Sequence, residues 1–536
     1  MLRHSLGQAM AFAFMLLSFA APAAAADYDA PEPSNALRLE LLGRHTAPEI
    51  EGAAEIASYD PATKRLFVVN SNQVTVDVLD IADPKNPNKI AALNLKKFGG
   101  VANSVAVHGG VVAVAVEAFD KQDPGAVHIF KTDGEFDAPL ASVPVGSLPD
   151  MVTFTPDGKY IVVACEGEPD DQYATDPEGS VWVIDMQQGP TKATGRMAGF
   201  QGFNLSKDEL QKAGVRIFGP HSTVAQDLEP EYIAVTPDSA RAYVALQENN
   251  AVAIVNIAKA EVEEILPLGF KDFSKPGNSL DPSNKDGGIH FGTYDNLYGM
   301  YQPDSIALAT IGDTLYLVTA NEGDSRDYDG WSEEERVAKV QLDPEAFPNA
   351  AELQKNEALG RLKITKTLGD TDGDGDFDEL YSFGARSFAI WKVKDHKITL
   401  VYDSGDQIER ITAAMLPDYF NSTDDENNTF DDRSDDKGPE PEALAVGEVG
   451  GRSYAFIGLE RIGGVMVYDI TNPESPVFVT YRNDRDFSGV VPEGTAGDLA
   501  PECIDFIPAD QSPNGKDIIA VANEVSGTTT LYEIVQ

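Results

Sequence analysis

The 536-residue sequence lacks the motifs of several well-known catalytic sites. It contains no G-x-S-x-G elbow to present a nucleophilic serine, no G-x-x-x-x-G-K-[ST] loop to cradle a phosphate and no H-E-x-x-H motif to bind zinc. It has two cysteines, Cys165 and Cys503, which excludes a site built from cysteine pairs. Any hydrolysis by this chain would therefore use a metal-bound water rather than a protein nucleophile.

Basic residues are also scarce. The chain has 41 lysines and arginines against 87 aspartates and glutamates, which gives a formal net charge of −46 at pH 7. Such a negative surface repels nucleic acid and anionic membranes and attracts cations. We therefore expect metal ions, and no nucleic acid, as partners.

Long apolar runs are absent after the first residues of the chain. Residues 9–19 form an apolar stretch that follows Arg3 and precedes a run of small residues ending at Ala26. This order is typical of a secretory signal with an A-x-A cleavage site, so residues 1–26 are predicted to be a signal peptide. No later run approaches the ~20 apolar residues needed to span a bilayer. We expect a soluble protein without a transmembrane segment, periplasmic or secreted.

The main positive feature of the sequence is an internal repeat. Seven times a short strand-like run opens beside a polar, usually acidic, residue, and a second apolar run follows. The opening residues are Glu55, Asn103, Asp150, Glu231, Asp304, Glu442 and Glu502. In six units the second run ends on a glutamate: Glu117, Glu166, Glu248, Glu322, Glu460 and Glu524. This repetition predicts an all-β fold, a seven-bladed β-propeller.

Residues 27–536 are predicted to form a single propeller domain. The blades are expected near 55–94, 104–145, 150–200, 231–267, 304–403, 442–482 and 502–534. The last blade has three strand-like runs of its own, so the early run at 37–42 is predicted to close it and to cover its exposed edge. Cys165 and Cys503 fall in the third and seventh blades, and we expect two separate buried thiols rather than a disulfide.

Three long insertions are predicted near 167–179, 323–385 and 407–440, because a blade needs only ~40–45 residues. Connections between the second and third strands, and between successive blades, emerge on the same side of a propeller. The insertions should therefore cover one face of the disc. Function is expected beneath them, since loops on a rigid scaffold commonly carry it.

The two acids of each repeat are expected to converge, because a first strand starts and a second strand ends on the same rim of the channel. Like charges at close range raise one another's pKa unless cations or hydrogen bonds compensate. The rim is therefore predicted to bind calcium, with a second divalent metal as an option. The candidate ligands are Glu55, Asp150, Glu231, Asp304, Glu322, Glu442, Glu460, Glu502 and Glu524. The alternative is that each acid accepts hydrogen bonds from backbone N–H groups of a neighbouring blade.

A separate calcium motif lies in the second insertion, at residues 370–379. Acids alternate along it and a glycine stands at the sixth position, as in the front half of a calcium loop. Tyr381 stands where such a loop has its bidentate glutamate. We expect a structural calcium ion here, which orders the insertion. The predicted ligands are Asp370, Asp372, Asp374, Asp376 and Asp378.

Three arginines lie beside the acids. Arg326 follows Glu322 closely, Arg386 precedes a predicted strand and Arg461 follows Glu460. One interpretation is that they neutralise carboxylates of the rim. The other is catalytic, with the guanidinium groups binding the phosphate or carboxylate of a substrate.

Four blocks of the sequence carry a family resemblance. They are residues 318–328 (Val-Thr-Ala-Asn-Glu-Gly-Asp-Ser-Arg-Asp-Tyr), 368–379, 383–387 (Phe-Gly-Ala-Arg-Ser) and 437–442 (Lys-Gly-Pro-Glu-Pro-Glu). In these blocks, and over about 37–534, the chain resembles the bacterial choice-of-anchor I family. That family is similar to mesenchyme-specific cell-surface glycoproteins and to an atypical cyanobacterial alkaline phosphatase. The resemblance implies an exported propeller and, through the members labelled alkaline phosphatase, phosphate-ester hydrolysis.

The leading functional hypothesis is an exported, calcium-binding propeller that acts as a metal-dependent phosphomonoesterase. Cations on the rim would activate a water, and Arg326, Arg386 or Arg461 would stabilise charge on the phosphate. The net negative charge opposes an anionic substrate, so bound calcium would have to invert the local field. The alternative is a non-enzymatic propeller that binds cations or a mineral or cell surface. A monomer is expected in either case.

Overall fold

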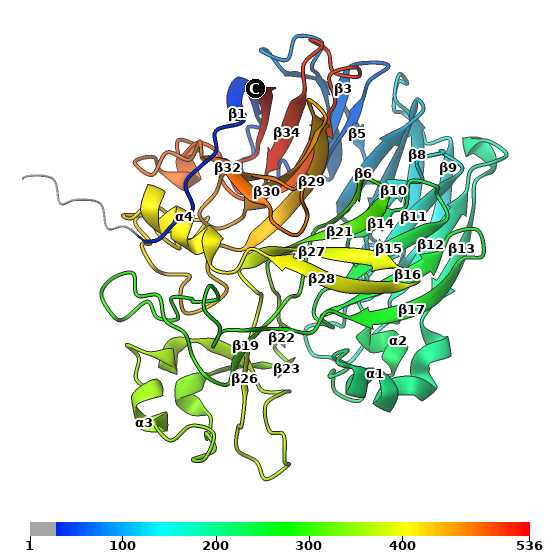
Figure 1. Ribbon diagram of the computed structural model, residues 1–536. Helices are drawn as coiled ribbons and strands as arrows, with labels where there is room; N and C mark the ends of the chain where they lie inside the picture. The colour runs from blue at the N-terminus through cyan, green and yellow to red at the C-terminus, as the bar shows by residue number, and fades with distance from the viewer. Residues whose placement is uncertain (1–27) are drawn as a thin grey trace, which may run out of the picture.

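The computed structural model describes residues 28–536, and seven four-stranded sheets are arranged around a central channel (Figure 1). Neighbouring strands within each of these sheets run antiparallel. The predicted all-β, seven-bladed propeller is confirmed. The predicted signal peptide, residues 1–26, lies outside the described residues.

The first four blades consist of consecutive strands. Blade one contains β2 (Ala57–Asp60), β3 (Arg65–Asn70), β4 (Thr75–Asp80) and β5 (Asn88–Asn94). Blade two contains β6 (Ala102–His108), β7 (Val111–Val116), β8 (Pro124–Lys131) and β9 (Ala141–Ser147). Blade three contains β10 (Pro149–Phe154), β11 (Tyr160–Cys165), β12 (Ser180–Asp185) and β13 (Thr194–Gly199). Blade four contains β14 (Ile233–Val235), β15 (Arg241–Leu246), β16 (Ala251–Asn256) and β17 (Glu261–Pro267).

The last three blades are interrupted or closed by distant segments. Blade five contains β20 (Ile306–Ile311), β21 (Thr314–Asn321), β27 (Ser387–Lys394) and β28 (Lys397–Asp403). Blade six contains β29 (Pro441–Val449), β30 (Arg452–Leu459), β31 (Val465–Asp469) and β32 (Val477–Arg482). Blade seven contains β33 (Pro501–Ile507), β34 (Ile518–Asn523), β35 (Thr528–Val535) and β1 (Arg38–Thr46).

The N-terminal strand closes the ring, as the sequence predicted. β1 pairs antiparallel with β35 from Arg38 opposite Val535 to Thr46 opposite Thr528. The strand is longer than the apolar run at 37–42 because pairing with β35 continues into polar residues beyond it. This closure joins the two ends of the described chain and covers an edge of the seventh blade.

The hydrophobic core lies between the blades. Second strands such as β7 and β11 are buried almost throughout, since both faces of each sheet pack on a neighbouring sheet. One cluster joins Leu66 and Val68 of the first blade to Ile518 and Ala520 of the seventh, across the closure. Strands buried on both faces are near-continuous apolar runs, which is why the repeat was visible in the sequence. Cys165 and Cys503 are buried free thiols, as expected.

The insertions carry the remaining elements. Their strands are β18 (Phe270–Asp272), β19 (Leu297–Met300), β22 (Asp327–Tyr328), β23 (Trp331–Ser332), β24 (Glu334–Arg336), β25 (Lys363–Thr365) and β26 (Leu380–Ser382). Their helices are η1 (Pro190–Lys192), η2 (Gln201–Ser206), α1 (Lys207–Ala213), α2 (Val224–Asp227), η3 (Val337–Lys339), α3 (Ala350–Leu353), η4 (Leu359–Arg361), α4 (Gln407–Met415) and η5 (Val491–Glu493). None of the helices within residues 28–536 is long and apolar enough to cross a bilayer.

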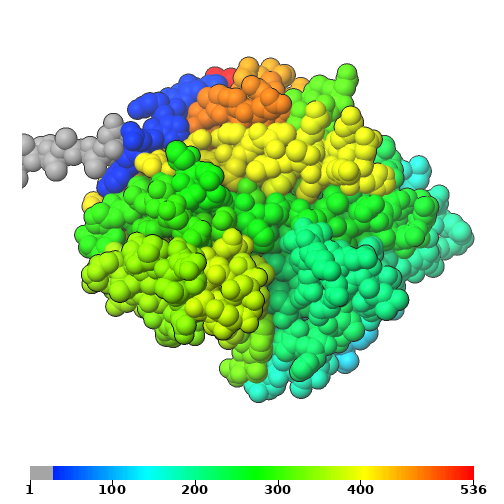
Figure 2. Space-filling view, turned by 60° about the horizontal axis from the view of Figure 1, so that its bottom comes forward, coloured from blue at the N-terminus to red at the C-terminus, as the bar shows by residue number. Residues whose placement is uncertain are grey.

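The insertions gather on one face of the disc, as predicted. Segments with α1 and α2 (teal) and with α3 (lime) lie side by side in Figure 2, and Arg216 of the first pairs with Glu333 of the second. Three further insertions, at 201–230, 268–303 and 483–500, accompany the predicted ones.

Candidate functional site

The opening acids are positioned by irregular starts of the inner strands. Register shifts fall between Pro149 and Val152 in β10, between Pro441 and Leu444 in β29, and between Pro501 and Cys503 in β33. A bulge at the start of a strand re-aims the side chain that it contains. The proline-acid pair at these openings thus turns Asp150, Glu442 and Glu502 out of the regular sheet.

A cavity of about 760 Å³ lies where these strands begin. It is lined by six of the nine predicted rim ligands: Glu55, Asp150, Glu231, Asp304, Glu502 and Glu524. Six further acids share the wall: Glu51, Glu117, Glu166, Glu168, Glu248 and Asp324. Lys121 is the one basic residue among the described residues of the lining, and its Nζ lies 2.6 Å from Glu168 Oε2.

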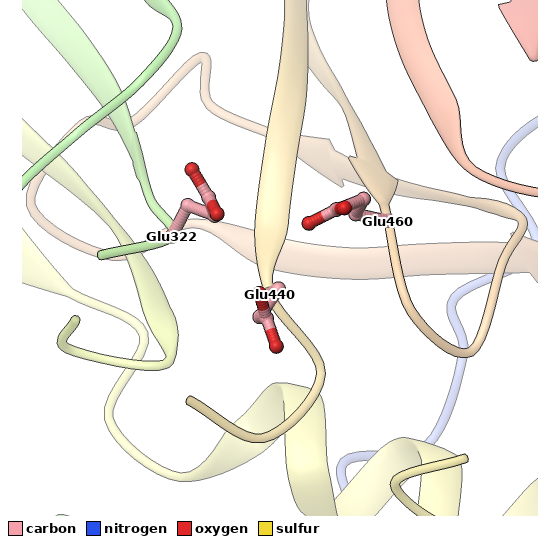
Figure 3. A group of neighbouring side chains, drawn as sticks. All are labelled: Glu322, Glu440 and Glu460. Carbon is pink, nitrogen blue, oxygen red and sulfur yellow. The ribbon is translucent and has the colours of Figure 1, made fainter. Parts of the chain in front are cut away.

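The other three predicted rim ligands, Glu322, Glu442 and Glu460, lie beside this cavity. Figure 3 shows Glu322 and Glu460 turned toward each other, with Glu440 below them. Oxygens of Glu322, Glu440 and Glu460 lie within 4.8 Å of one another. The carboxylate of Glu442 interacts electrostatically with Glu502, Glu460 and Glu322, which links the two groups. The structure therefore brings all nine predicted rim acids to one mouth of the channel.

These carboxylates are costly to ionise together. Burial first, and then neighbouring acids, raise the pKa of Glu55 and of Asp304 to about 8. The same causes, in the same order, raise the pKa values of Glu231, Glu442 and Glu502 well above the ordinary range. The site therefore needs either protons or cations to be stable at neutral pH.

Backbone N–H groups of neighbouring blades, the alternative partners of these acids, do not bind them within residues 28–536 of the structure. In the described part of the chain, no backbone N–H donates to any of the nine predicted rim carboxylates, and Glu55 and Glu322 accept from Ser71 and Gln247 side chains instead. The Oε2 atoms of five buried glutamates have no hydrogen-bond partner within residues 28–536: Glu231, Glu248, Glu440, Glu442 and Glu460. Buried oxygens without donors are expected to bind a cation or a proton.

Arg326 is not part of the cavity wall; it lies in a buried ion network and interacts electrostatically with Glu248, which does line the cavity. Its side chain is 1% exposed, with NH1 lying 3.1 Å from Asp227 Oδ1 and NH2 lying 2.9 Å from Glu229 Oε2. The guanidinium also stacks on the ring of Phe218 at 4.6 Å. The guanidinium donors already bind Asp227 and Glu229. This favours the interpretation that Arg326 neutralises carboxylates over the interpretation that it binds a substrate.

The side chain of Arg386 is also used in contacts within the protein. It is 2% exposed and donates to Glu409 Oε1 at 2.9 Å and to the carbonyl oxygens of Asp281, Ser434 and Asp436. Its backbone has a φ of 55°, a left-handed conformation that directs the side chain beneath the third predicted insertion. Arg386 therefore anchors that insertion and does not reach the cavity.

Arg461 is the one predicted catalytic arginine that lies at the rim. Its guanidinium lies 2.7 Å from Asp424 Oδ2, 3.0 Å from Glu440 Oε2 and 3.0 Å from Glu460 Oε1. Its side chain is 24% exposed, so it is more accessible than Arg326 and Arg386. The positive charge of Arg461 is therefore already paired with three carboxylates of the protein.

The predicted calcium loop is divided in the structure. Oxygens of Asp370, Asp372 and Asp374 form one group within 4.8 Å, whereas Asp376 and Asp378 form a second group with Asp343. Asp343 is brought there by a parallel bridge between Leu342 and Phe377. The five predicted ligands therefore do not converge on one point, and the sequence pattern contained nothing that identified Asp343.

Other residues of the site were also not predicted as ligands. The repeat did mark Glu117, Glu166 and Glu248, which lie just after second strands, although they were not selected as ligands. Glu51, Glu168, Asp324 and Lys121 fall outside the repeat, and their spacing gave no indication of the cavity.

Fold and site together define a seven-bladed β-propeller with an acidic channel mouth covered by insertions. A family model, the choice-of-anchor I domain, matches residues 55–473, so the chain belongs to the choice-of-anchor I family. This confirms the resemblance found in the sequence. Membership of this family indicates a surface-anchored or extracellular protein.

Two relatives are similar over part of their length. The mesenchyme-specific cell surface glycoprotein of Strongylocentrotus purpuratus is 30% identical over 349 residues, 59% of this chain and 42% of that protein. Gigasin-3a of Magallana gigas is 32% identical over 192 residues, 34% of this chain and 66% of that protein. The matches thus span less than two thirds of either relative.

Solved structures with a similar course of the chain have low sequence identity. Hydrazine synthase of Kuenenia stuttgartiensis is 13% identical, with 91% of this chain and 97% of that chain covered and a TM-score of 0.44. The β-propeller domain of Myceliophteria thermophila Cps50 (Swd1) is 8% identical, with 91% and 99% covered and a TM-score of 0.43. The fold assignment rests on the seven sheets of this chain.

Proposed function

We propose that this protein binds divalent cations, with calcium as the first candidate, in the acidic cavity at the mouth of its propeller, and that it does so outside the cell or in the periplasm. The observation that carries the proposal is the wall of the cavity, where twelve carboxylates face one lysine. Carboxylate oxygens are the preferred ligands of calcium, which accepts six to eight oxygens in flexible geometry. Buried oxygens of Glu231 and Glu248 without donors support the same conclusion.

The test is a calcium titration by calorimetry. Wild-type protein is expected to bind calcium, and the Glu231→Gln/Asp304→Asn variant is expected to bind it at least tenfold more weakly, because two wall carboxylates are lost without change of shape. A matched control is Glu40→Gln/Glu261→Gln, whose side chains are 52% and 64% exposed. Equal affinity in the rim variant and the control would refute the cavity as the binding site.

We expect a second, structural calcium site in the insertion loop at 370–378. Asp370, Asp372 and Asp374 are exposed and share one small space, and Asp370 accepts hydrogen bonds from the N–H groups of Gly373 and Gly375. Calcium should slow tryptic cleavage within residues 323–385 at least tenfold in the wild type. In Asp372→Asn/Asp374→Asn the protection should disappear, as measured by mass spectrometry of the fragments. Cleavage at the same calcium-dependent rate in this variant would mean that the loop holds no ion.

Metal-dependent phosphomonoester hydrolysis is the second candidate. The specific observation in its favour is size, because 760 Å³ exceeds the roughly 30 Å³ that each water occupies many times over and leaves room for a small ester beside cations. Bound cations would polarise the phosphoryl oxygen and lower the pKa of a bound water. Lys121 is the one lining residue that could pair with an anion, while the acidic wall opposes one.

Turnover of a chromogenic phosphomonoester distinguishes the two candidates. An enzyme should lose activity in chelator, regain it with calcium, and be inactive as Glu442→Gln or Glu322→Gln. Wild-type protein that binds calcium but gives no turnover would exclude hydrolysis of this substrate class and leave cation binding as the function.

A further inference from the structure

The third predicted insertion places a lysine in the acidic rim. Lys437 lies three residues before Glu440, and residues 431–440 are mostly buried. Its Nζ lies 2.7 Å from Glu322 Oε1 and 3.0 Å from Glu440 Oε2, with Asp324 Oδ1 at 3.8 Å. The ammonium therefore joins the insertion to the end of β21, in the neighbouring blade.

Three glutamates surround this position. Glu322 follows β21, the second strand of blade five, while Glu440 precedes β29 and Glu460 follows β30 of blade six. Glu440 is fully buried, and Glu322 and Glu460 are each 8% exposed. In Figure 3 the side chains of Glu322 and Glu460 face each other across the start of the strand that follows Glu440.

The three glutamates are neutralised unequally. Glu440 is paired with Arg433, Arg461 and Lys437, and these cations hold its pKa below the ordinary range, although burial alone would raise it. Glu322 has Lys437 as its one cationic partner within residues 28–536. It also accepts a hydrogen bond from the side-chain amide of Gln247. Glu460 has Arg461, and its Oε2 atom has no hydrogen-bond partner in the described chain.

We propose that Glu322, Glu440 and Glu460 form a cation site that the Lys437 ammonium shares with the guanidinium groups of Arg433 and Arg461. A divalent metal such as calcium binds there once the ammonium is removed. The rim would then have two parts. One is a cavity that binds ions from solvent, and the other is a smaller site that a lysine side chain of the protein itself occupies. This inference does not depend on the cavity proposal, since it concerns different residues and a different occupant.

The geometry suits a metal as well as a lysine. Ligand oxygens 2.3–2.6 Å from calcium lie no farther than about 5 Å from each other, and the three glutamates offer oxygens within 4.8 Å. The free Oε2 of Glu460 supplies a ligand that the lysine leaves unused. Glu442, whose Oε2 also lacks a hydrogen-bond partner within residues 28–536, interacts electrostatically with Glu460 and Glu322 and is a further candidate ligand.

The test replaces Lys437 by methionine, which keeps the length of the side chain and removes its charge. After purification in calcium and dialysis, the Lys437→Met variant is expected to retain one more calcium ion per chain than the wild type, as counted by elemental mass spectrometry. Its melting temperature is expected to fall in chelator and to be restored by calcium. An unchanged ion count, or a variant that calcium does not stabilise, overturns the proposal.

Three controls sharpen the result. Lys437→Arg keeps the positive charge and should gain no ion. Lys363→Met removes a lysine that pairs with Glu334 and with Asp436 of the same insertion, outside the glutamate group, and should also gain none. Lys437→Met/Glu460→Gln should lose the additional ion, whereas retention of it would place the ion elsewhere. Because each count is a difference from the wild type, failure of cavity binding would not alter the outcome.

Discussion

Replacing Arg326 by methionine is expected to lower the free energy of unfolding by about 3–5 kcal/mol, because removing one partner of a buried ion network leaves uncompensated charges behind. Arg326 is the bridge between Asp227 and Glu229, which are 0% and 1% exposed. Methionine fills much of the same space but offers no hydrogen-bond donor. Urea denaturation of the wild type and the variant measures the loss.

The matched control for this experiment is Arg38→Met. Arg38 pairs with Glu40, but the two side chains are 61% and 52% exposed, and exposed pairs contribute less than about 1 kcal/mol. Equal effects of the two substitutions would show that the Arg326 network is as weakly coupled to folding as a surface pair. An intermediate value for Arg326→Lys would separate the contribution of charge from that of the forked guanidinium geometry.

Without calcium, the protein is expected to lose stability as pH rises from about 4.5 to about 8. Glu55 has an ordinary pKa of 4.5 and a folded-state pKa of about 8, and Asp304 has values of 3.8 and about 8. Because the folded chain holds the additional protons, these groups stabilise it fully below their unfolded pKa values, and the stabilisation is lost as pH rises through 8. We expect a loss on the order of 3 kcal/mol after solvent screening of these partly exposed groups.

Saturating calcium is expected to remove most of this pH dependence. A ligand at one hundred times its dissociation constant stabilises the folded state by about 2.7 kcal/mol, and the gain should be larger at pH 8 than at pH 5, where protons compete for the same oxygens. Scanning calorimetry with chelator and with calcium at the two pH values measures both effects. A calcium effect that is equal at both pH values would be inconsistent with ligands of raised pKa.

The blades could be predicted from the sequence because they repeat a local pattern. Strands buried on both faces, such as β7 and β11, must be apolar throughout, and seven copies of this requirement leave a visible period. Convergence of Glu231, Asp304 and Glu502 followed from the same argument, since equivalent positions in successive blades share one rim.

The contacts that insertions make could not be predicted in this way. Lys437 reaches Glu322, 115 residues earlier in the chain, and Asp343 reaches Asp376 through a bridge between two loops. Such pairings depend on tertiary packing, which the spacing of residues along the sequence does not reveal. The arginines illustrate the same limit, because the sequence showed that Arg326 and Arg386 lie near acids in the chain but not that both are buried in ion networks outside the cavity wall.

The most direct test of the acidic cavity as a cation site is a crystal soaked in terbium, a calcium substitute with strong anomalous scattering. The account predicts an anomalous peak inside the cavity, within about 2.6 Å of carboxylate oxygens that include Glu231, Glu248 or Asp304. Peaks confined to the 370–378 loop or to the outer surface, with none in the cavity, would contradict it.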